Sequence, residues 1–457
     1  MHRLDKRARH CANTILKAGD IHVVSHIDAD GLTSAAIICT ALERAGRDYS
    51  VEFVRQLDVS ILEGIADNNS TLTVFTDLGS GMLDQITKLG INAVISDHHI
   101  PAGDCPTHLN PHVFNINGAY EISGAGITFL LARALGDNND LAGLAVVGAV
   151  GDLQHVKHGK LTGINRQIVG VGRESNVLHC QRDLTLFGKQ TRPVYKMLQY
   201  SSDPYLPGLT GNEDACIAFL KDIGVRYHGE GWLRWIDLND EEKKKVVTGL
   251  MRYCISAGIP AYKIERLVGE VYTLPREREG TETRDASEFS TLLNATARYD
   301  RAKTGLAVCM GDRDKEYENA IHLLAEHRRN LVEGINLVKS QGVVTLDNLQ
   351  YFDAGSKIKD TIVGIVAGMS ASSVGNRNLP IIAFANTDDG VKVSGRGNYD
   401  LVRKGLNLGV SLNSAAQAVG GVGGGHDVAA GATIPQGAKS EFIRKLDQMI
   451  GSQLRSS

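Results

Sequence analysis

The sequence has few aromatic side chains, no long apolar run and no pair of cysteines with metal-binding spacing. Aromatic residues make up 5% of its 457 residues, and none of its seven cysteines belongs to a C-x-x-C motif. An odd number of cysteines is typical of a reduced, intracellular protein. The longest apolar stretches, such as residues 141–150, are far shorter than the ~20 residues that span a bilayer. The basic N-terminus leads into no apolar signal core. We therefore predict a cytoplasmic protein without membrane attachment.

Several familiar catalytic patterns are absent as well. The sequence has no G-x-S-x-G nucleophile elbow, no H-E-x-x-H zinc motif and no Walker A phosphate loop. No G-x-G-x-x-G follows the first predicted strand, so hydride transfer lacks support. The net charge of −3 argues against a polycationic surface that grips duplex DNA by charge alone. Binding of a single strand by metal ions and a few local arginines stays open.

The first ~190 residues alternate strand and helix signals. Short apolar runs rich in β-branched residues predict buried strands at 21–27, 49–54, 71–76 and 91–96. The segments between them predict helices at 32–45, 61–66 and 82–89, and a long apolar region predicts two buried helices split at 136–139. This alternation predicts an α/β fold with a mostly parallel sheet and helices on both faces.

The pattern changes after this first part. Residues 191–290 predict a mainly helical insertion, 291–340 a joining segment with a long charged connector helix, and 341–457 a second, smaller α/β domain. Strands are expected there at 342–346, 381–385 and 391–394, before a glycine-rich stretch at 420–435. We interpret Trp232 and Trp235 as core residues, with base stacking as the alternative.

Acidic patches follow the predicted strands of the first part. They are His26, Asp28 and Asp30 after the first strand, Asp77 after the third, Asp97, His98 and His99 after the fourth, and Asp152 at the end of the apolar helical run. Open α/β sheets bind ligands outside the carboxyl ends of their strands, so these loops should converge. Carboxylates packed together repel unless a cation lies between them. The set therefore predicts two divalent cations and phosphate-ester hydrolysis.

The spacing suggests how these ligands are arranged. His26, Asp28 and Asp30 would share one face if extended geometry continued to Asp30, and Gly31 would then allow a tight turn. Asp77 is placed to bridge two metals, and an imidazole ligand from His98 would favour Mn²⁺ over Mg²⁺. Singly, each patch has an ordinary explanation as a turn, a helix cap or a solvated loop. Four such loops in chain order favour a metal site.

Weaker candidates for substrate binding lie later in the chain. Arg396 follows a predicted strand and could donate two parallel hydrogen bonds to a phosphate, although an ordinary surface arginine is the alternative. The backbone N–H groups of Gly424 and Gly425 could bind an anion, and the His426 side chain beside them could donate a hydrogen bond to it. A flexible loop with a structural histidine would have the same sequence pattern. Arg298 could line a strand-binding groove or a solvated helix face.

The order D-x-D-G, a lone strand-end aspartate, D-H-H and G-D resembles the DHH phosphoesterase superfamily. The glycines and alanines at 424–431 and the S-G-R at 394–396 resemble its DHH-associated domain. The segment LLNATARYDRAKTGLAVCMGD at 292–312 is similar to the joining segment of RecJ-like nucleases, and the insertion fits the archaeal members. The resemblance implies a DHH domain at 1–190 and a DHH-associated domain at 341–457 across a cleft.

The resemblance also implies a Mn²⁺ pair, with Mg²⁺ as a substitute, and a role for each matching residue. The implied metal ligands are His26, Asp28, Asp30, Asp77, His98 and Asp152. Bacterial sequences often have aspartate at the position of His26. Asp77 and His99 would be catalytic, and Asp97 would orient the loop of His98. The implied substrate contacts are Ser394, Arg396, Gly424, Gly425, His426 and Arg298.

Our leading hypothesis is a Mn²⁺-dependent RecJ-like exonuclease that hydrolyses single-stranded DNA or RNA during replication or repair. A second reading is a small-substrate phosphoesterase for nano-RNA, 3′-phosphoadenosine phosphate or cyclic dinucleotides. A third is a replisome scaffold, because archaeal relatives are expected to associate with the GINS complex of the replicative helicase. Retention of the whole ligand set argues against a purely structural role.

Overall fold

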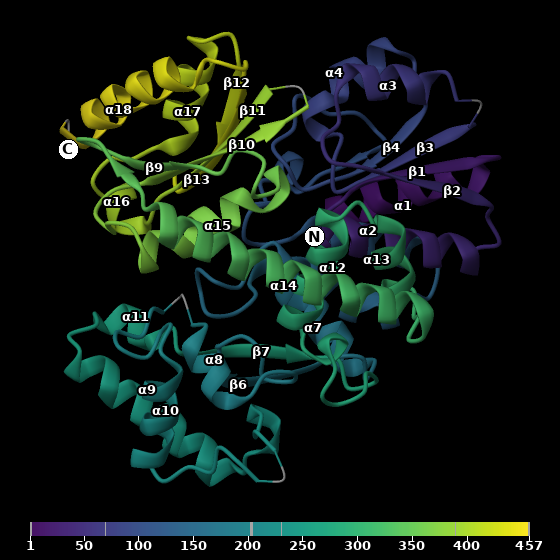
Figure 1. Ribbon diagram of the computed structural model, residues 1–457. Coiled ribbons are helices and arrows are strands. Elements are labelled where there is room, and N and C mark those ends of the chain that lie inside the picture. The colour runs from purple at the N-terminus through teal and green to yellow at the C-terminus, as the bar shows by residue number, and fades with distance from the viewer. Residues whose placement is uncertain (1, 69, 202–203, 230, 389, 456–457) are drawn as a thin grey trace. The chain divides into compact units, whose positions relative to one another are not determined.

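The computed structural model describes residues 2–68, 70–201, 204–229, 231–388 and 390–455. The chain forms two compact units, Met1–Leu324 and Ala325–Ser457, each with hydrophobic cores of its own (Figure 1). Both units mix helices and strands, so the predicted α/β class is confirmed. In the described part of the chain, none of the helices has the length and apolar character of a membrane span.

The first unit is built on a five-stranded parallel sheet. Its strands are β1 (Ile21–His26), β2 (Tyr49–Val54), β3 (Leu72–Thr76), β4 (Ala93–Ser96) and β5 (His108–Leu109), in the order β2-β1-β3-β4-β5. All residues of β3 are buried, as expected for a strand covered on both faces. The predicted parallel sheet is confirmed, and its strand ends meet at one edge.

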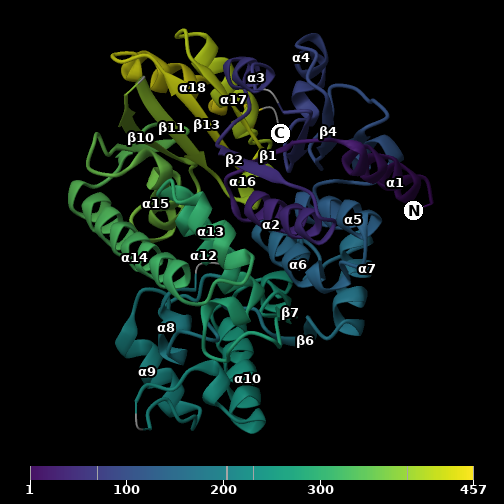
Figure 2. The ribbon, with the colours of Figure 1, turned by 90° about the vertical axis from the view of Figure 1, so that its right-hand side faces the viewer.

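Alternate residues of these strands pack against different helices. Val23, Val74 and Val94 belong to the main core, together with α1 (His2–Lys17), α2 (Ala29–Arg44), α5 (Gly124–Leu135) and α6 (Ala142–Gly151). Their neighbours Val24 and Phe75 pack on the other side with α3 (Val59–Ala66) and α4 (Leu83–Lys88). Each such buried side chain contributes about 1.5–3 kcal/mol. Helices α2, α5 and α6 lie side by side under the sheet (Figure 2).

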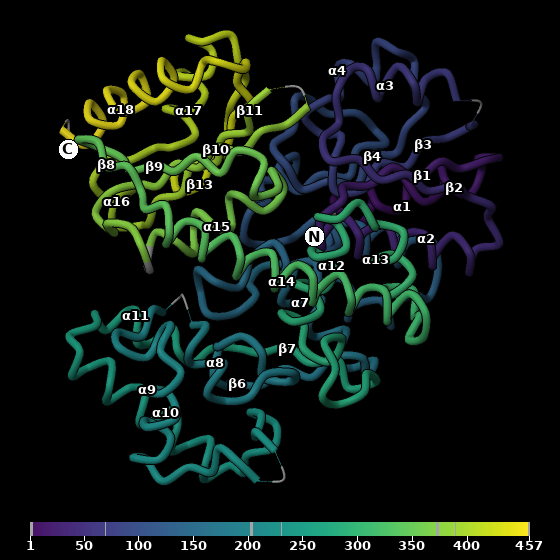
Figure 3. The backbone as a smooth tube through the Cα atoms, in the orientation of Figure 1, coloured from purple at the N-terminus to yellow at the C-terminus, as the bar shows by residue number. Residues whose placement is uncertain are grey.

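The insertion leaves and re-enters this unit through two paired strands. After α7 (Gly163–Glu174), β6 (His179–Leu184) pairs antiparallel with β7 (Val268–Thr273). Between them lie α8 (Val194–Gln199), α9 (Glu213–Asp222), α10 (Asp240–Ser256) and α11 (Ala261–Glu265), around a separate core (Figure 3). Trp235 is 2% exposed in that core, whereas Trp232 is 42% exposed. The core assignment is therefore right for Trp235 and wrong for Trp232.

Three helices after the insertion lead out of the first unit. They are α12 (Ala286–Arg298), α13 (Ala302–Cys309) and α14 (Lys315–Gln341), the predicted long charged helix. Phe289, Leu292 and Leu293 of α12 are buried in the main core with α2 and α6. The segment after the insertion thus completes the core that the first residues of the chain begin.

The second unit has a six-stranded mixed sheet in the order β12-β13-β11-β10-β9-β8. Its elements are β8 (Val344–Thr345), β9 (Gln350–Asp353), α15 (Asp360–Ser373), β10 (Ile381–Thr387), β11 (Gly390–Arg396), α16 (Tyr399–Val402), α17 (Leu408–Gln417), β12 (Val422–Gly425), β13 (Ala429–Ile434) and α18 (Lys439–Arg455). The expected strands near 342–346, 381–385 and 391–394 are present. The glycine-rich stretch also forms strands, and its missing side chains let α17 pack closely on them: a Cβ on Gly423 would lie 3.0 Å from the Leu412 carbonyl oxygen of α17.

Candidate metal centre

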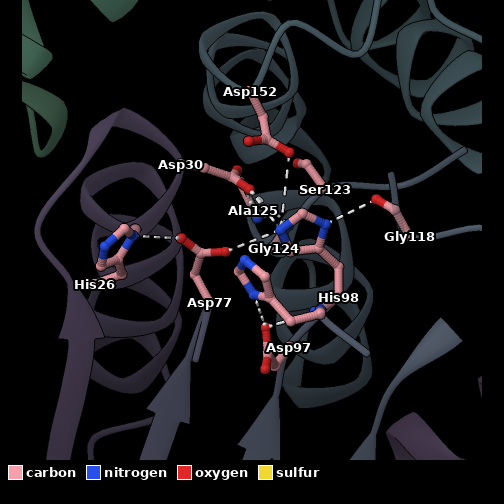
Figure 4. A network of polar contacts seen from close by, with 12 residues as sticks. His26, Asp30, Asp77, Asp97, His98, Gly118, Ser123, Gly124, Ala125 and Asp152 are labelled. Atoms are coloured by element: carbon pink, nitrogen blue, oxygen red, sulfur yellow. Dashed lines mark hydrogen bonds and ion pairs between the residues drawn. The ribbon is translucent and has the colours of Figure 1, made fainter. Parts of the chain in front are cut away.

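The acidic patches converge at the carboxyl edge of the parallel sheet (Figure 4). Three groups of side chains place ligand atoms within 4.8 Å of one another. They are His26, Asp28 and Asp77; Asp30, His98 and Asp152; and Asp77, Asp97, His98 and His99. All six implied metal ligands thus come together, with His99 beside them.

The expectation that extended geometry continues to Asp30 is wrong. Strand β1 ends at His26, and Asp28 caps α2 by accepting a hydrogen bond of 2.9 Å from the Gly31 amide. Asp30 therefore lies in the first helical turn and joins a different ligand group from Asp28. Gly31 does not form a turn but lets the start of α2 lie close to the end of β1, because a Cβ there would lie 2.1 Å from the His26 carbonyl oxygen.

Asp77 stands between two of these groups. Its Oδ2 lies 3.5 Å from His26 Nδ1 and its Oδ1 lies 3.3 Å from His98 Nε2. The residue is 2% exposed and has a left-handed φ of 60°. Within the described part of the chain, Asp77 Oδ1 accepts no hydrogen bond of good geometry. A buried carboxylate oxygen without such a donor fits a cation as its partner.

Asp30 is held by the N-terminus of a helix. Its Oδ2 accepts a 2.7 Å hydrogen bond from the Gly124 amide and its Oδ1 accepts one of 3.0 Å from Ala125, the first residues of α5. These donors stabilise the carboxylate. Burial, followed by the charges of Asp77 and Asp152, nevertheless raises the pKa of Asp30 well above its ordinary value. The cluster carries more negative charge than the protein alone neutralises.

His98 presents one ring nitrogen to the carboxylates. Its Nδ1 donates to the Gly118 carbonyl oxygen at 2.8 Å, which leaves Nε2 as the basic nitrogen, 3.8 Å from Asp30 Oδ2 and from Asp152 Oδ2. Burial alone would lower the pKa of His98, but Asp77 and the other carboxylates outweigh it and raise that pKa. The carboxylates around Nε2 therefore favour a positive charge at this nitrogen.

Asp152 caps the C-terminus of α6 and is oriented by Gln154. The Gln154 side-chain amide donates to Asp152 Oδ2 at 3.0 Å and to the Gly118 oxygen at 2.8 Å. It therefore links Asp152 to the same carbonyl oxygen that accepts the His98 hydrogen bond. Burial raises the pKa of Asp152 to about 6, although His98 opposes the shift. The sequence analysis missed Gln154, because its role depends on a loop 36 residues away.

His26 and Asp28 form the other side of the site. His26 Nδ1 lies 3.1 Å from Asp28 Oδ2. Burial opposes the charge on His26, but Asp28 and Asp77 outweigh it and raise its pKa to about 11. Burial likewise opposes ionisation of Asp28, yet His26 lowers its pKa to about 2. This pair and Asp77 offer one nitrogen and two carboxylates to a second cation.

Asp97 supports the loop that carries both histidines. Its Oδ1 accepts from the His98 amide at 2.7 Å and from His99 Nδ1 at 2.8 Å, and its Oδ2 accepts from the Ser80 amide at 3.0 Å. Against burial, these donors hold the pKa of Asp97 well below its ordinary value. The His99 side chain is 58% exposed, so it stands at the solvent-facing rim of the site.

Two glycines make this packing possible. A Cβ on Gly124 would lie 2.3 Å from Asp77 Oδ1, and a Cβ on Gly148 would lie 2.4 Å from Asp30 Oδ1. Helices α5 and α6 therefore contact the carboxylates at positions that have no side chain. The sequence analysis missed both positions, because nothing in the local sequence shows which glycine faces a carboxylate.

The predicted substrate contacts divide between the two units. Arg298 lies at the end of α12, and α12 is fixed to the start of α2 by a 3.1 Å hydrogen bond from the Ala29 amide to Asn294 Oδ1. Burial lowers the pKa of Arg298 despite the charge of Asp28 nearby. The others, Ser394, Arg396, Gly424, Gly425 and His426, belong to the second unit. Their part in the site stays a prediction.

Three family models match consecutive parts of the chain. They describe the DHH family N-terminal domain at residues 20–149, the DHH-CID domain at 186–268 and the DHHA1 domain at 346–452. An uncharacterized protein of Methanocaldococcus jannaschii, MJ0831, is 34% identical over 447 residues, which cover 96% of this chain and 94% of that protein. The chain belongs to the DHH family, as the resemblance predicted.

Within this family the chain is similar to RecJ. The single-stranded-DNA-specific exonuclease RecJ of Thermus thermophilus is 28% identical over 167 residues, which are 33% of this chain and only 24% of RecJ. Its Mn²⁺ complex shares the fold, with a TM-score of 0.61 and 17% identity over 98% of this chain and 55% of that one. CDC45 from Entamoeba histolytica has a TM-score of 0.66 and 13% identity over 98% of both chains.

Proposed function

We propose that this protein is a Mn²⁺-dependent exonuclease that hydrolyses phosphodiester bonds of single-stranded DNA or RNA. The observation that carries the proposal is Asp77, whose two carboxylate oxygens face two different groups of metal-ligand side chains. Its similarity to RecJ, a single-stranded-DNA-specific exonuclease with a known Mn²⁺ complex, supports both the reaction and the metal.

Each group of ligands can hold one cation. His26, Asp28 and Asp77 would hold the first, and Asp30, His98 and Asp152 the second, with Asp77 shared. A mixed set of imidazoles and carboxylates suits Mn²⁺ better than Mg²⁺. When bound, two such ions supply Lewis acidity that activates water and offsets the negative charge of a phosphodiester.

The protein's own groups orient the substrate and the ligands. The Gly118 oxygen fixes the tautomer of His98, and Asp97 fixes the ring of His99. His99, exposed at the rim, can donate a hydrogen bond to a non-bridging phosphate oxygen. Arg298 adds a cation on the Asp28 side, and its positive charge favours the phosphates of a bound strand.

The direct test uses single-stranded oligonucleotides labelled at one end or the other, as DNA and as RNA, with Mn²⁺. A ladder of shortened products is expected for the wild-type protein, and Asp77→Ala should abolish it. Asp84→Ala, an exposed aspartate of α4, is the matched control and should degrade the strand normally. Equal rates for Asp77→Ala and the control would refute the bridging role of Asp77. Turnover of dinucleotides without degradation of longer strands would favour the small-substrate reading.

The likeness to CDC45 favours a second candidate, a replisome scaffold that binds a GINS complex. Co-migration of the purified protein with GINS on a sizing column would support it, and Asp77→Ala should co-migrate equally well. Because that assay needs no hydrolysis, the two candidates can be tested separately.

A further inference from the structure

The segment matched by the DHH-CID model concentrates aromatic side chains in a chain that has few of them. Residues 186–268 hold 10 of the 25 aromatic residues, although they are less than a fifth of the sequence. They also carry 12 lysines and arginines against 10 aspartates and glutamates, whereas the whole chain has a net charge of −3. Slight positive charge with exposed rings is the composition of surfaces that bind single-stranded nucleic acid.

Rings and cations alternate along one continuous set of contacts, which we call the ring–cation row. Its members, in spatial order, are Phe187, Arg192, Tyr200, Lys196, Tyr195 and Trp232. The guanidinium or ammonium centres lie 4.7, 5.3, 5.6 and 5.1 Å from the successive ring centres, and the last two rings are 4.5 Å apart. His228 continues the row at 5.1 Å from Trp232.

Two rings of the row are open to solvent. Trp232 is 42% exposed and Tyr200 is 47% exposed. The other tryptophan, Trp235, shows what a structural role looks like here: it is 2% exposed, and its indole N–H donates to Asp183 Oδ2 at 3.0 Å. Exposed aromatic rings beside cations are suited to stacking on bases.

The row is built into the fold. The Val194 amide of α8 donates to the Leu233 oxygen at 2.9 Å, and the Leu233 amide donates to the Tyr227 oxygen at 3.1 Å, so the Trp232 turn is tied to α8. Gly188, with φ of 97°, leaves room for Arg192, since a Cβ there would lie 2.5 Å from the Arg192 side chain. A surface arranged in advance loses little entropy on binding.

We infer that the ring–cation row is a binding site for single-stranded nucleic acid, with bases stacking on Trp232 and Tyr200 and with Arg192 near the phosphates. An acidic polypeptide is the competing occupant. Bases fit better, because Lys196 already donates to Glu213 at 2.6 Å and the most exposed members of the row are aromatic rings. This site needs no metal ion and stands apart from the proposed hydrolysis.

The test measures binding of a fluorescein-labelled oligo-dT or oligo-rA to the full chain in EDTA, by anisotropy. Trp232→Ala alone should weaken binding by roughly fivefold to a hundredfold, the range for loss of one stacked base, and the double variant Trp232→Ala with Tyr200→Ala should weaken it further. Trp232→Phe keeps a ring and should bind within about twofold of wild type. Tyr262→Ala, which removes a 43% exposed tyrosine of the same segment outside the row, is the matched control and should also bind normally.

A second readout separates this site from other contacts. The chain has two tryptophans, so oligonucleotide binding should quench the fluorescence of the wild type but not that of Trp232→Phe. Unchanged affinity of the double variant would overturn the proposal. Displacement of the oligonucleotide by poly-glutamate at equal charge would also overturn it and assign the row to an acidic polypeptide. Because EDTA prevents metal-dependent hydrolysis, failure here and failure of the nuclease assay are distinguishable.

Discussion

His98 Nε2 lies 3.3 Å from Asp77 Oδ1, and both residues are buried. Asp77 supplies its other oxygen, Oδ2, to His26 on the opposite side at 3.5 Å. One aspartate thus joins a histidine from the end of β1 to a histidine from the end of β4. The charges on His26, Asp77 and His98 and on the carboxylates around them determine several measurable properties.

Asp77→Asn should separate metal binding from folding. The substitution keeps the shape and tolerates the left-handed backbone, but removes a buried charge from a crowded carboxylate cluster. We expect Mn²⁺ affinity to fall by at least about 100-fold, while the metal-free protein becomes more stable by roughly 1 kcal/mol. Calorimetric titration and thermal unfolding in EDTA measure the two effects. A metal-free variant much less stable than wild type would contradict this reading of Asp77.

Metal affinity should depend on pH through Asp152. Its pKa is raised to about 6, so the protonated form predominates below that value and a metal ion must displace the proton. Mn²⁺ affinity should therefore rise as pH increases from about 5 to about 7, and binding should release protons. Titration in two buffers of different ionisation enthalpy measures that release. Asp152→Asn should bind more weakly with a shallower pH dependence, and equal slopes for both proteins would exclude Asp152 as the source.

Gly148→Ala should damage the site without damaging the helix. The new Cβ would lie 2.4 Å from Asp30 Oδ1, so the carboxylate must move, and we expect Mn²⁺ affinity to fall about tenfold or more. Gly170→Ala in α7 is the control, because nothing lies within 4 Å of its Cβ. It should stabilise the protein by about 0.4–1 kcal/mol and leave metal binding unchanged. Equal metal affinity in the two variants would show that α6 can shift away from Asp30.

Glu288 should make folding stability pH-dependent away from the metal centre. It is 1% exposed, its Oε1 accepts from the Gln190 amide at 2.7 Å, and burial followed by Asp285 raises its pKa to about 7. Between the unfolded value of about 4.3 and about 7, the folded state keeps a proton that the unfolded state releases. The stabilisation is complete below that window and is lost as pH rises through it, by roughly 2–4 kcal/mol. Urea unfolding of wild type against Glu288→Gln should show a difference that changes across this window and is constant outside it.

The sequence was sufficient to predict the parallel sheet, because short apolar runs rich in β-branched residues, such as 72–76, are typical of buried strands. It was also sufficient to predict where the acidic patches lie, because they follow those runs. It was insufficient wherever a choice depends on distant contacts. Asp30 was expected to be extended, yet the capping bond of Asp28 starts the helix at Ala29, three residues before the predicted start at residue 32. Trp232 and Trp235 look alike in sequence, and only the fold shows that one is exposed. The space that Gly148 leaves for Asp30 likewise appears only when α6 and α2 meet.

The packing of α12 into the main core has a consequence during protein synthesis. Phe289, Leu292 and Leu293 complete a core begun by α2, and Asn294 accepts the amide of Ala29, 265 residues earlier. A ribosome adding about 5–20 residues per second makes the whole insertion before these side chains emerge. Helices α2 and α6 of the nascent chain must therefore wait, with part of their apolar surface uncovered, until α12 arrives to cover it.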